Sequence, residues 1–211
     1  MSAGAAAVPV AVHRALPPED AARGDFYALL ARLLHSAPDP ALLAHIAAAP
    51  PIPADGDAAL ARAWQGLRDA SSVMDADAAA EEYEKLFVGM GKSELSIYAG
   101  YYGCAPAIDH PRVRIQGELA ALGLARPGTV TEPEDHYAAL FDVMRVLVAG
   151  GAGRAPAPLA EQRRFFDAFL RDGVGKFFAA VGGSPKANYY RHVAALGAAF
   201  TALEVESFLL D

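Results

Sequence analysis

The strongest constraint on the fold is the spacing of large apolar residues in the last part of the chain. Five of them, separated by four, three, four and three positions, are Tyr189, Val193, Leu196, Phe200 and Leu203. An α-helix turns once in about 3.6 residues, so this spacing puts all five side chains on one face. The segment that begins at Ser184-Pro185 therefore predicts a long helix with one buried side.

The same spacing recurs upstream. One apolar stripe consists of Phe26, Leu30, Leu33 and Leu34, and another consists of Tyr137, Leu140, Phe141, Met144 and Val148. Hydrophobic residues make up 54% of the 211 residues, and much of that share is alanine, which favours helices over sheets. No segment alternates apolar and polar residues as a strand would. We predict an all-α fold, a single-domain helical bundle.

Proline, glycine and aspartate mark the expected ends of the helices. The first four predicted helices begin at Pro17-Pro18, at Asp39-Pro40, at Asp57 and near Asp75 or Asp77. Three more are predicted at 111–122, 133–149 and 159–172. A short helical piece with Phe177 and Phe178 follows, and then the last helix, which begins at Ser184-Pro185. Residues 89–110, rich in glycine and tyrosine, are expected to be irregular.

Residues 131–141 combine a helix-start signal with acidic residues and a histidine. Thr131 and Glu134 fit a capping box, and Pro133 suits a first helical turn. The carboxylates of residues 132–135 also lie where the helix dipole favours negative charge, by about 0.3–1 kcal/mol each. A cap does not explain His136, a weak helix former at the start of an apolar helix. The segment is therefore either a well-made helix start or an acidic recognition site.

Composition excludes several classes of protein. The formal charge of −7 and the pI near 5.3 argue against a nucleic-acid partner, since phosphate binding needs a basic face. The single cysteine, Cys104, excludes an internal disulfide framework. Residues 1–17 lack the basic start of a signal peptide and are predicted to form a flexible arm before an all-helical domain at 18–211. No membrane span is expected, so we predict a cytoplasmic protein.

No sequence motif indicates catalysis. Gly91-Lys92-Ser93 ends like a phosphate-binding loop, but Leu86 stands where that pattern needs a glycine, and no strand precedes it. The six histidines form no metal-binding pair, and no serine or cysteine lies in a nucleophile motif. We predict a protein that is not an enzyme and holds no cofactor or metal.

Aromatic residues gather around the glycine-rich turn that precedes the irregular segment. They are Tyr83, Phe87, Tyr98, Tyr101 and Tyr102, with Leu86 between the first two. Core packing is the simplest interpretation of Leu86 and Phe87, whereas tyrosines in an irregular segment suit a peptide-binding surface. An apolar groove beside the acidic turn would fit a ligand with basic residues followed by a hydrophobic stretch.

These elements together resemble the TorD/DmsD/NarJ family of molybdoenzyme-specific chaperones. The resemblance rests on Tyr83-x-x-Leu86-Phe87-x-Gly89, on Glu94 and Tyr98, on Glu132-Pro133-Glu134-Asp135-His136, and on the C-terminal Phe166-x-x-Phe169-Leu170, Phe177-Phe178 and Asn188-Tyr189-Tyr190. It spans residues 20–208, and its most specific part is the Glu-Pro-x-Asp-His element. The run at 89–98 and residues 122–126 look most like members associated with formate dehydrogenases.

The resemblance implies a non-catalytic role. Such chaperones bind the twin-arginine signal peptide, or a similar N-terminal segment, of a molybdopterin oxidoreductase, hold the apoenzyme until its cofactor is inserted, and delay export. The peptide-binding residues it implies are Tyr83, Leu86, Phe87, Tyr98, Glu132, Pro133, Asp135 and His136. Family members also exchange helices between protomers, so a monomer or a domain-swapped dimer is expected, with 150–158 as the hinge.

Two other functions fit parts of the sequence. A nucleotide-binding regulatory protein would use the Gly91-Lys92-Ser93 segment, and loss of GTP binding in Lys92→Ala would favour it. A structural helical subunit of a redox complex would stay bound to mature enzyme, whereas a chaperone leaves before maturation ends.

Overall fold

The computed structural model describes residues 16–53, 56–89, 93–103, 111–124, 133–151 and 153–210. Its elements are α1 (Pro18–His35), α2 (Pro40–Ala48), α3 (Ala58–Val73), α4 (Ala76–Tyr83), the π-turn η1 (Glu84–Val88), the 3₁₀ turn η2 (Ala99–Tyr102), α5 (Pro111–Ala121), α6 (Tyr137–Ala149), α7 (Leu159–Phe169), α8 (Val174–Gly183) and α9 (Tyr190–Leu210). Pairing within these ranges is limited to isolated bridges, which confirms the all-α prediction.

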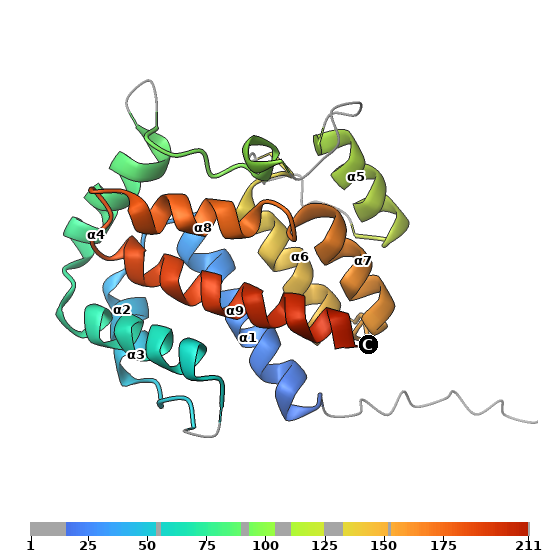
Figure 1. Ribbon diagram of the computed structural model, residues 1–211, viewed down its shortest axis with the longest axis horizontal. Coiled ribbons are helices and arrows are strands. Elements are labelled where there is room, and N and C mark those ends of the chain that lie inside the picture. The colour runs from blue at the N-terminus through green and yellow to red at the C-terminus, as the bar shows by residue number, and fades with distance from the viewer. Residues whose placement is uncertain are drawn as a thin grey trace, which may run out of the picture.

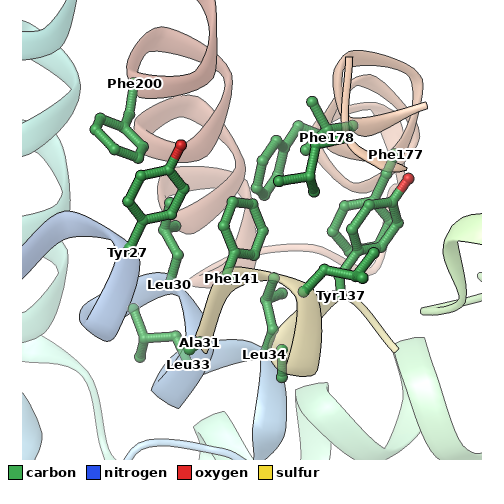
Figure 2. Close-up of a cluster of buried hydrophobic side chains, with 14 of the residues drawn as sticks. Tyr27, Leu30, Ala31, Leu33, Leu34, Tyr137, Phe141, Phe177, Phe178 and Phe200 are labelled. Atoms are coloured by element: carbon green, nitrogen blue, oxygen red, sulfur yellow. The ribbon is translucent and has the colours of Figure 1, made fainter. Parts of the chain in front are cut away.

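The helices pack around one aromatic core. α1 lies against α6, α9 packs on α8 and α3, and α2 packs beside α3 (Figure 1). Tyr27 on α1 lies between Phe141 of α6 and Phe200 of α9, with ring centroids 5.9 and 4.8 Å away. Tyr137 of α6 stacks on Phe177 of α8 at 4.4 Å (Figure 2). The predicted apolar stripes therefore meet in a single core.

Aspartates start three of the helices, as predicted. The side chains of Asp39, Asp57 and Asp75 accept hydrogen bonds from the backbone N–H of the residue three positions later, at 2.8, 2.7 and 3.0 Å. Each satisfies a donor that the first turn leaves without an intrahelical partner. These caps are local, so the sequence could specify them.

Two predicted helix starts were wrong, and both errors involve distant partners. The last helix begins at Tyr190, not at Ser184-Pro185. Glu82 of α4, 6% exposed, caps it by accepting from the backbone N–H groups of Asn188 and Tyr190 at Oε1 and of Tyr189 at Oε2, at 2.7–2.9 Å. The helix predicted at 133–149 begins at Tyr137. The helix predicted at 159–172 ends early, at Phe169.

α9 is long and apolar enough, by length and composition alone, to cross a membrane, with a mean hydropathy of 1.6. Its buried side packs on α1, α3 and α8 in the bundle. Glu204 lies on that buried side and is 3% exposed. Core packing therefore accounts for the apolar character of α9.

A buried polar cluster joins α9 to α1. Glu204 accepts two hydrogen bonds from the Arg23 guanidinium, one from Nε at 2.8 Å and one from Nη2 at 2.9 Å. The Tyr27 hydroxyl donates to the same carboxylate at 2.7 Å. Burial, together with the negative charge of Glu204, raises the pKa of Tyr27 well above its ordinary value. The phenol therefore stays a donor at any physiological pH, and the cluster stays complete.

Candidate functional site

The candidate site is built around the turn at residues 133–136, which enters α6. The turn is closed by a hydrogen bond from the backbone N–H of His136 to the carbonyl of Pro133, at 3.1 Å. His136 is the N-cap of α6, and its Nδ1 accepts from the backbone N–H of Ala138 at 3.1 Å. The predicted capping box is thereby corrected, since Glu134 precedes the helix. Thr131 and Glu132 lie outside the described residues.

A second segment, residues 93–103, lies against this turn, and we call it the strap. The backbone N–H of Ala99 donates to the Asp135 carbonyl at 2.8 Å, and that of Tyr137 donates to the Ile97 carbonyl at 3.1 Å. The Tyr98 ring stands edge-on to the His136 ring, with centroids 5.5 Å apart. The structure thus places Tyr98 next to Asp135 and His136, two residues that follow it by nearly forty positions in the sequence.

Asp135 is an acidic residue with little solvent contact. It is 5% exposed, and its Oδ1 accepts from Nε of Arg112 on α5 at 3.1 Å. The arginine side chain is 45% exposed, whereas that of Asp135 is 7% exposed. Next to it, Gln116 of α5 donates to Glu134 at 2.9 Å. The carboxylate predicted to bind a ligand's arginine is therefore occupied by an arginine of the chain itself.

The predicted residues Tyr83, Leu86 and Phe87 lie at the junction of α4 and η1. Leu86 and Phe87 are 0% and 6% exposed, and the Leu86 carbonyl accepts from the backbone N–H of Leu95, at 2.9 Å, where the strap begins. The Tyr83 ring packs on Phe87 at 5.3 Å, and its hydroxyl donates to the His35 carbonyl at 2.9 Å. Leu86 thus holds the strap through its backbone, while Phe87 packs in the core. A direct peptide contact by these residues stays a prediction.

The same end of the strap is bound to the turn between α8 and α9. Glu94 accepts from the Ser184 hydroxyl at 2.5 Å and from the Lys186 ammonium at 2.6 Å. These two hydrogen bonds, of which the one from Lys186 has the larger effect, lower the pKa of the exposed Glu94 carboxyl. The strap therefore connects the core at Leu86, the turn at 133–136 and the turn between α8 and α9.

A groove opens beside the turn. Its volume is about 970 Å³, and its lining comes from α1, α5, α6, the turn before α6 and residues 151, 153 and 154. The apolar part of the lining includes Ala28 and Ala31 of α1, Ile115 and Leu119 of α5, and Ala139, Val143 and Val146 of α6. The polar part carries both charges: Glu134 and Asp142 are acidic, and Arg32, Arg145 and Arg154 are basic, with His35 and His136 beside them. An apolar channel with charged groups at its sides has the composition of a peptide-binding groove.

Sequence reasoning did not find Arg112. The residue is exposed and carries no motif, and its partner Asp135 lies 23 positions away. Nothing local in the sequence marks this pair. The described residues contain no group of three histidine, cysteine, aspartate or glutamate side chains that could hold a metal ion. Lys92 of the phosphate-loop-like segment lies outside the described residues.

Comparisons with known proteins bear on this arrangement. The sequence model of the nitrate reductase delta subunit family matches residues 54–179. The chain belongs to this family. That range contains the strap, α5 and the turn at 133–136, and the match confirms the resemblance to the TorD/DmsD/NarJ chaperones.

Structural comparison supports the same fold. A crystal structure of a protein assigned to redox enzyme maturation, from Archaeoglobus fulgidus, superposes with a TM-score of 0.54 at 18% identity, covering 85% of this chain and 93% of that one. A search of curated proteins gave no match. This chain therefore shares its all-helical architecture with a protein of distant sequence that is assigned to redox enzyme maturation.

Proposed function

We propose that this chain is a maturation chaperone for a molybdopterin oxidoreductase and that it binds an N-terminal peptide of the catalytic subunit. Membership of the nitrate reductase delta subunit family supports the chaperone role. The observation that supports the peptide site is a turn that carries the buried Asp135 between Glu134 and His136, two residues that line an apolar groove of about 970 Å³. The chaperone acts in the cytoplasm, before its client is loaded with cofactor and exported, and carries out no chemistry itself.

The buried Asp135 carboxylate and the apolar part of the groove favour a peptide with arginine next to apolar residues. An arginine guanidinium can donate two parallel hydrogen bonds to a carboxylate, and such pairs gain strength where water is excluded. Asp135 is 5% exposed, which meets that condition. The small side chains of Ala28, Ala31 and Ala139 leave room for an apolar segment along the groove. Tyr98 flanks the same site through its contact with His136.

Release also has to be possible, because the client leaves after maturation. An apolar groove with one well-placed carboxylate gives modest affinity and tolerates different apolar sequences. We propose that Tyr98, Glu132, Pro133, Asp135 and His136 form the contact surface, and that Tyr83, Leu86 and Phe87 support it. The client subgroup associated with formate dehydrogenases remains part of the proposal.

Binding of a labelled synthetic peptide tests the site. The probe carries two adjacent arginines followed by a leucine- and alanine-rich stretch, and anisotropy measures its affinity. Asp135→Asn should weaken binding at least about tenfold, roughly 1.4 kcal/mol, while the melting temperature stays close to that of the wild type. Asp69→Asn on the exposed side of α3 removes the same charge away from the groove and should have no effect.

His136 needs a variant that keeps the helix start. His136→Asn retains a side-chain acceptor suited to an N-cap, so any loss of affinity reports on the imidazole and not on α6. Equal affinity of wild type, Asp135→Asn and His136→Asn in folded protein would remove these residues from the site. Capture of a molybdopterin oxidoreductase subunit from native cells by wild type, but not by Asp135→Asn, would connect the site to its client.

A further inference from the structure

α5 carries the pattern of side chains that the groove is proposed to bind, an arginine followed by apolar residues. Arg112, Ile115, Leu119 and Leu122 follow one another at intervals of three, four and three, so they lie on one side of the segment. Arg112 pairs with Asp135, Ile115 is fully buried and Leu122 is 6% exposed, and Ile115 and Leu119 line the groove. An arginine followed by apolar residues thus already lies along this site.

Contacts on both sides hold α5 in this position. Toward the groove, Gln116 donates to Glu134, and Arg154 donates to the carbonyl of Leu122. On the opposite side, Glu118 accepts from Arg164 of α7 at 2.6 Å. Figure 1 shows α5 at the edge of the molecule beside α7. α5 therefore forms one wall of the groove and is held there mainly by side-chain contacts.

We propose that α5 is an internal stand-in for the client peptide, with Arg112 in the place of the client's arginine, so that client binding requires α5 to give up this contact. The inference rests on the proposed function, since it concerns the same carboxylate and groove. It adds a regulatory step: the empty chaperone keeps its recognition carboxylate paired and keeps α5 as one wall of the groove, and an unsuitable peptide cannot displace α5.

The geometry of the Arg112–Asp135 pair suits an exchangeable contact. A single nitrogen, Nε, makes the contact, at 3.1 Å, whereas an arginine facing a carboxylate squarely makes two bonds. Arg112 is also 45% exposed on its side chain, and ion pairs with an exposed member are weak. A client arginine that approaches end-on and brings a longer apolar segment can therefore replace it.

The test compares peptide binding in two arginine variants of α5. Arg112→Gln removes the stand-in, and affinity for the diarginine probe peptide should rise about three- to tenfold, since a larger fraction of the protein is open to the peptide. Arg114→Gln is the matched control. Arg114 lies over the Phe169 ring, 5.7 Å from its centroid, and makes no ion pair with Asp135 among the described residues, so its loss leaves Asp135 paired and affinity should rise less than in Arg112→Gln.

A second measurement needs no variant. In wild-type protein, hydrogen exchange across residues 111–122 should become faster when the probe peptide binds, because the peptide displaces α5. Slower exchange there would mean that α5 closes over the peptide, and it would overturn the inference. Unchanged or weaker affinity in Arg112→Gln would overturn it as well.

The two proposals fail in different ways. If Asp135→Asn weakens peptide binding but Arg112→Gln does not strengthen it, the peptide site stands and the stand-in role of α5 falls. If the probe does not bind, or binds wild type and Asp135→Asn equally, the proposed function fails and the inference falls with it. A synthetic peptide of residues 111–124 should compete with the probe for the Arg112→Gln protein, and its own Arg112→Gln version should not.

Discussion

The buried carboxylates of this molecule differ between its two sides. Near the end of α9, Glu204 accepts from three donors of Arg23 and Tyr27, and at its start Glu82 accepts from three backbone N–H groups. Between α5 and α6, Asp135 is about as buried, but among the described residues its side chain has one ion-pair partner, Arg112. The first two carboxylates each accept three hydrogen bonds, whereas the Asp135 side chain accepts one from the described residues.

This difference separates a structural role from a binding role. A carboxylate with three short hydrogen bonds fixes helices in one arrangement, because loss of any donor leaves buried charge without compensation. A carboxylate with one exchangeable partner can accept another arginine at little cost. We expect substitutions on the α4–α9 side to reduce stability, and substitutions on the α5–α6 side to alter binding.

Glu82 should give the largest stability effect. In Glu82→Gln an NH₂ group replaces one of the two carboxylate oxygens. That group cannot accept a hydrogen bond, so at least one of the three backbone N–H groups loses its partner. We expect the free energy of unfolding to fall by about 2–5 kcal/mol, measured by urea denaturation. Glu81→Gln, one residue earlier and 72% exposed on its side chain, should change stability by less than about 0.5 kcal/mol.

Double-mutant cycles give the second, intermediate effect and compare the two sides directly. For Arg23→Met with Glu204→Gln, the coupling energy should be about 1.5–3 kcal/mol, because the pair is bidentate and largely buried. For Arg112→Gln with Asp135→Asn, it should stay below about 1 kcal/mol. Equal coupling energies in the two cycles would contradict the distinction between a fixed and an exchangeable carboxylate.

The smallest effect concerns the tether of the strap and depends on pH. Hydrogen bonds from Lys186 and Ser184 lower the pKa of Glu94 below its ordinary value. A lowered carboxyl pKa means that the stabilisation is complete above the ordinary value and is lost as the pH falls through the lowered one. Wild type should therefore melt slightly higher than Glu94→Gln at neutral pH, and this difference should vanish in acid. A difference that persists in acid would show that the charge of Glu94 is not its cause.

Much of the fold could be predicted because its signals are local. Asp39, Asp57 and Asp75 cap helices through a residue three positions ahead, and apolar stripes at helical spacing are visible in any short window. The start of α9 could not be predicted, since Glu82 lies 106 positions before the first amide that it caps. The start of α6 was missed because the strap binds the backbone there: Ala99 donates to the Asp135 carbonyl, and Tyr137 donates to the Ile97 carbonyl. Asp135 therefore stays outside the helix, and Tyr137 is its first residue.

The candidate site was predicted only in part. The family resemblance pointed to Tyr98, Asp135 and His136, and the structure places these three together. The resemblance assigned Leu86 to the peptide contact, whereas core packing was the simplest interpretation of the residue itself, and Leu86 is fully buried. The resemblance also could not reveal Arg112, whose meaning comes entirely from the carboxylate that the fold brings next to it.

The cap that Glu82 provides also has a consequence for folding kinetics. The cap closes a loop of about a hundred residues, and the chain loses the entropy of that closure before the contact returns any energy. We therefore expect the cap to form after the rate-limiting step, when α4 and α9 are already docked. Substitutions at Glu82 should then accelerate unfolding much more than they slow folding. The same three hydrogen bonds that fix the position of α9 would thus determine how long the folded chaperone persists.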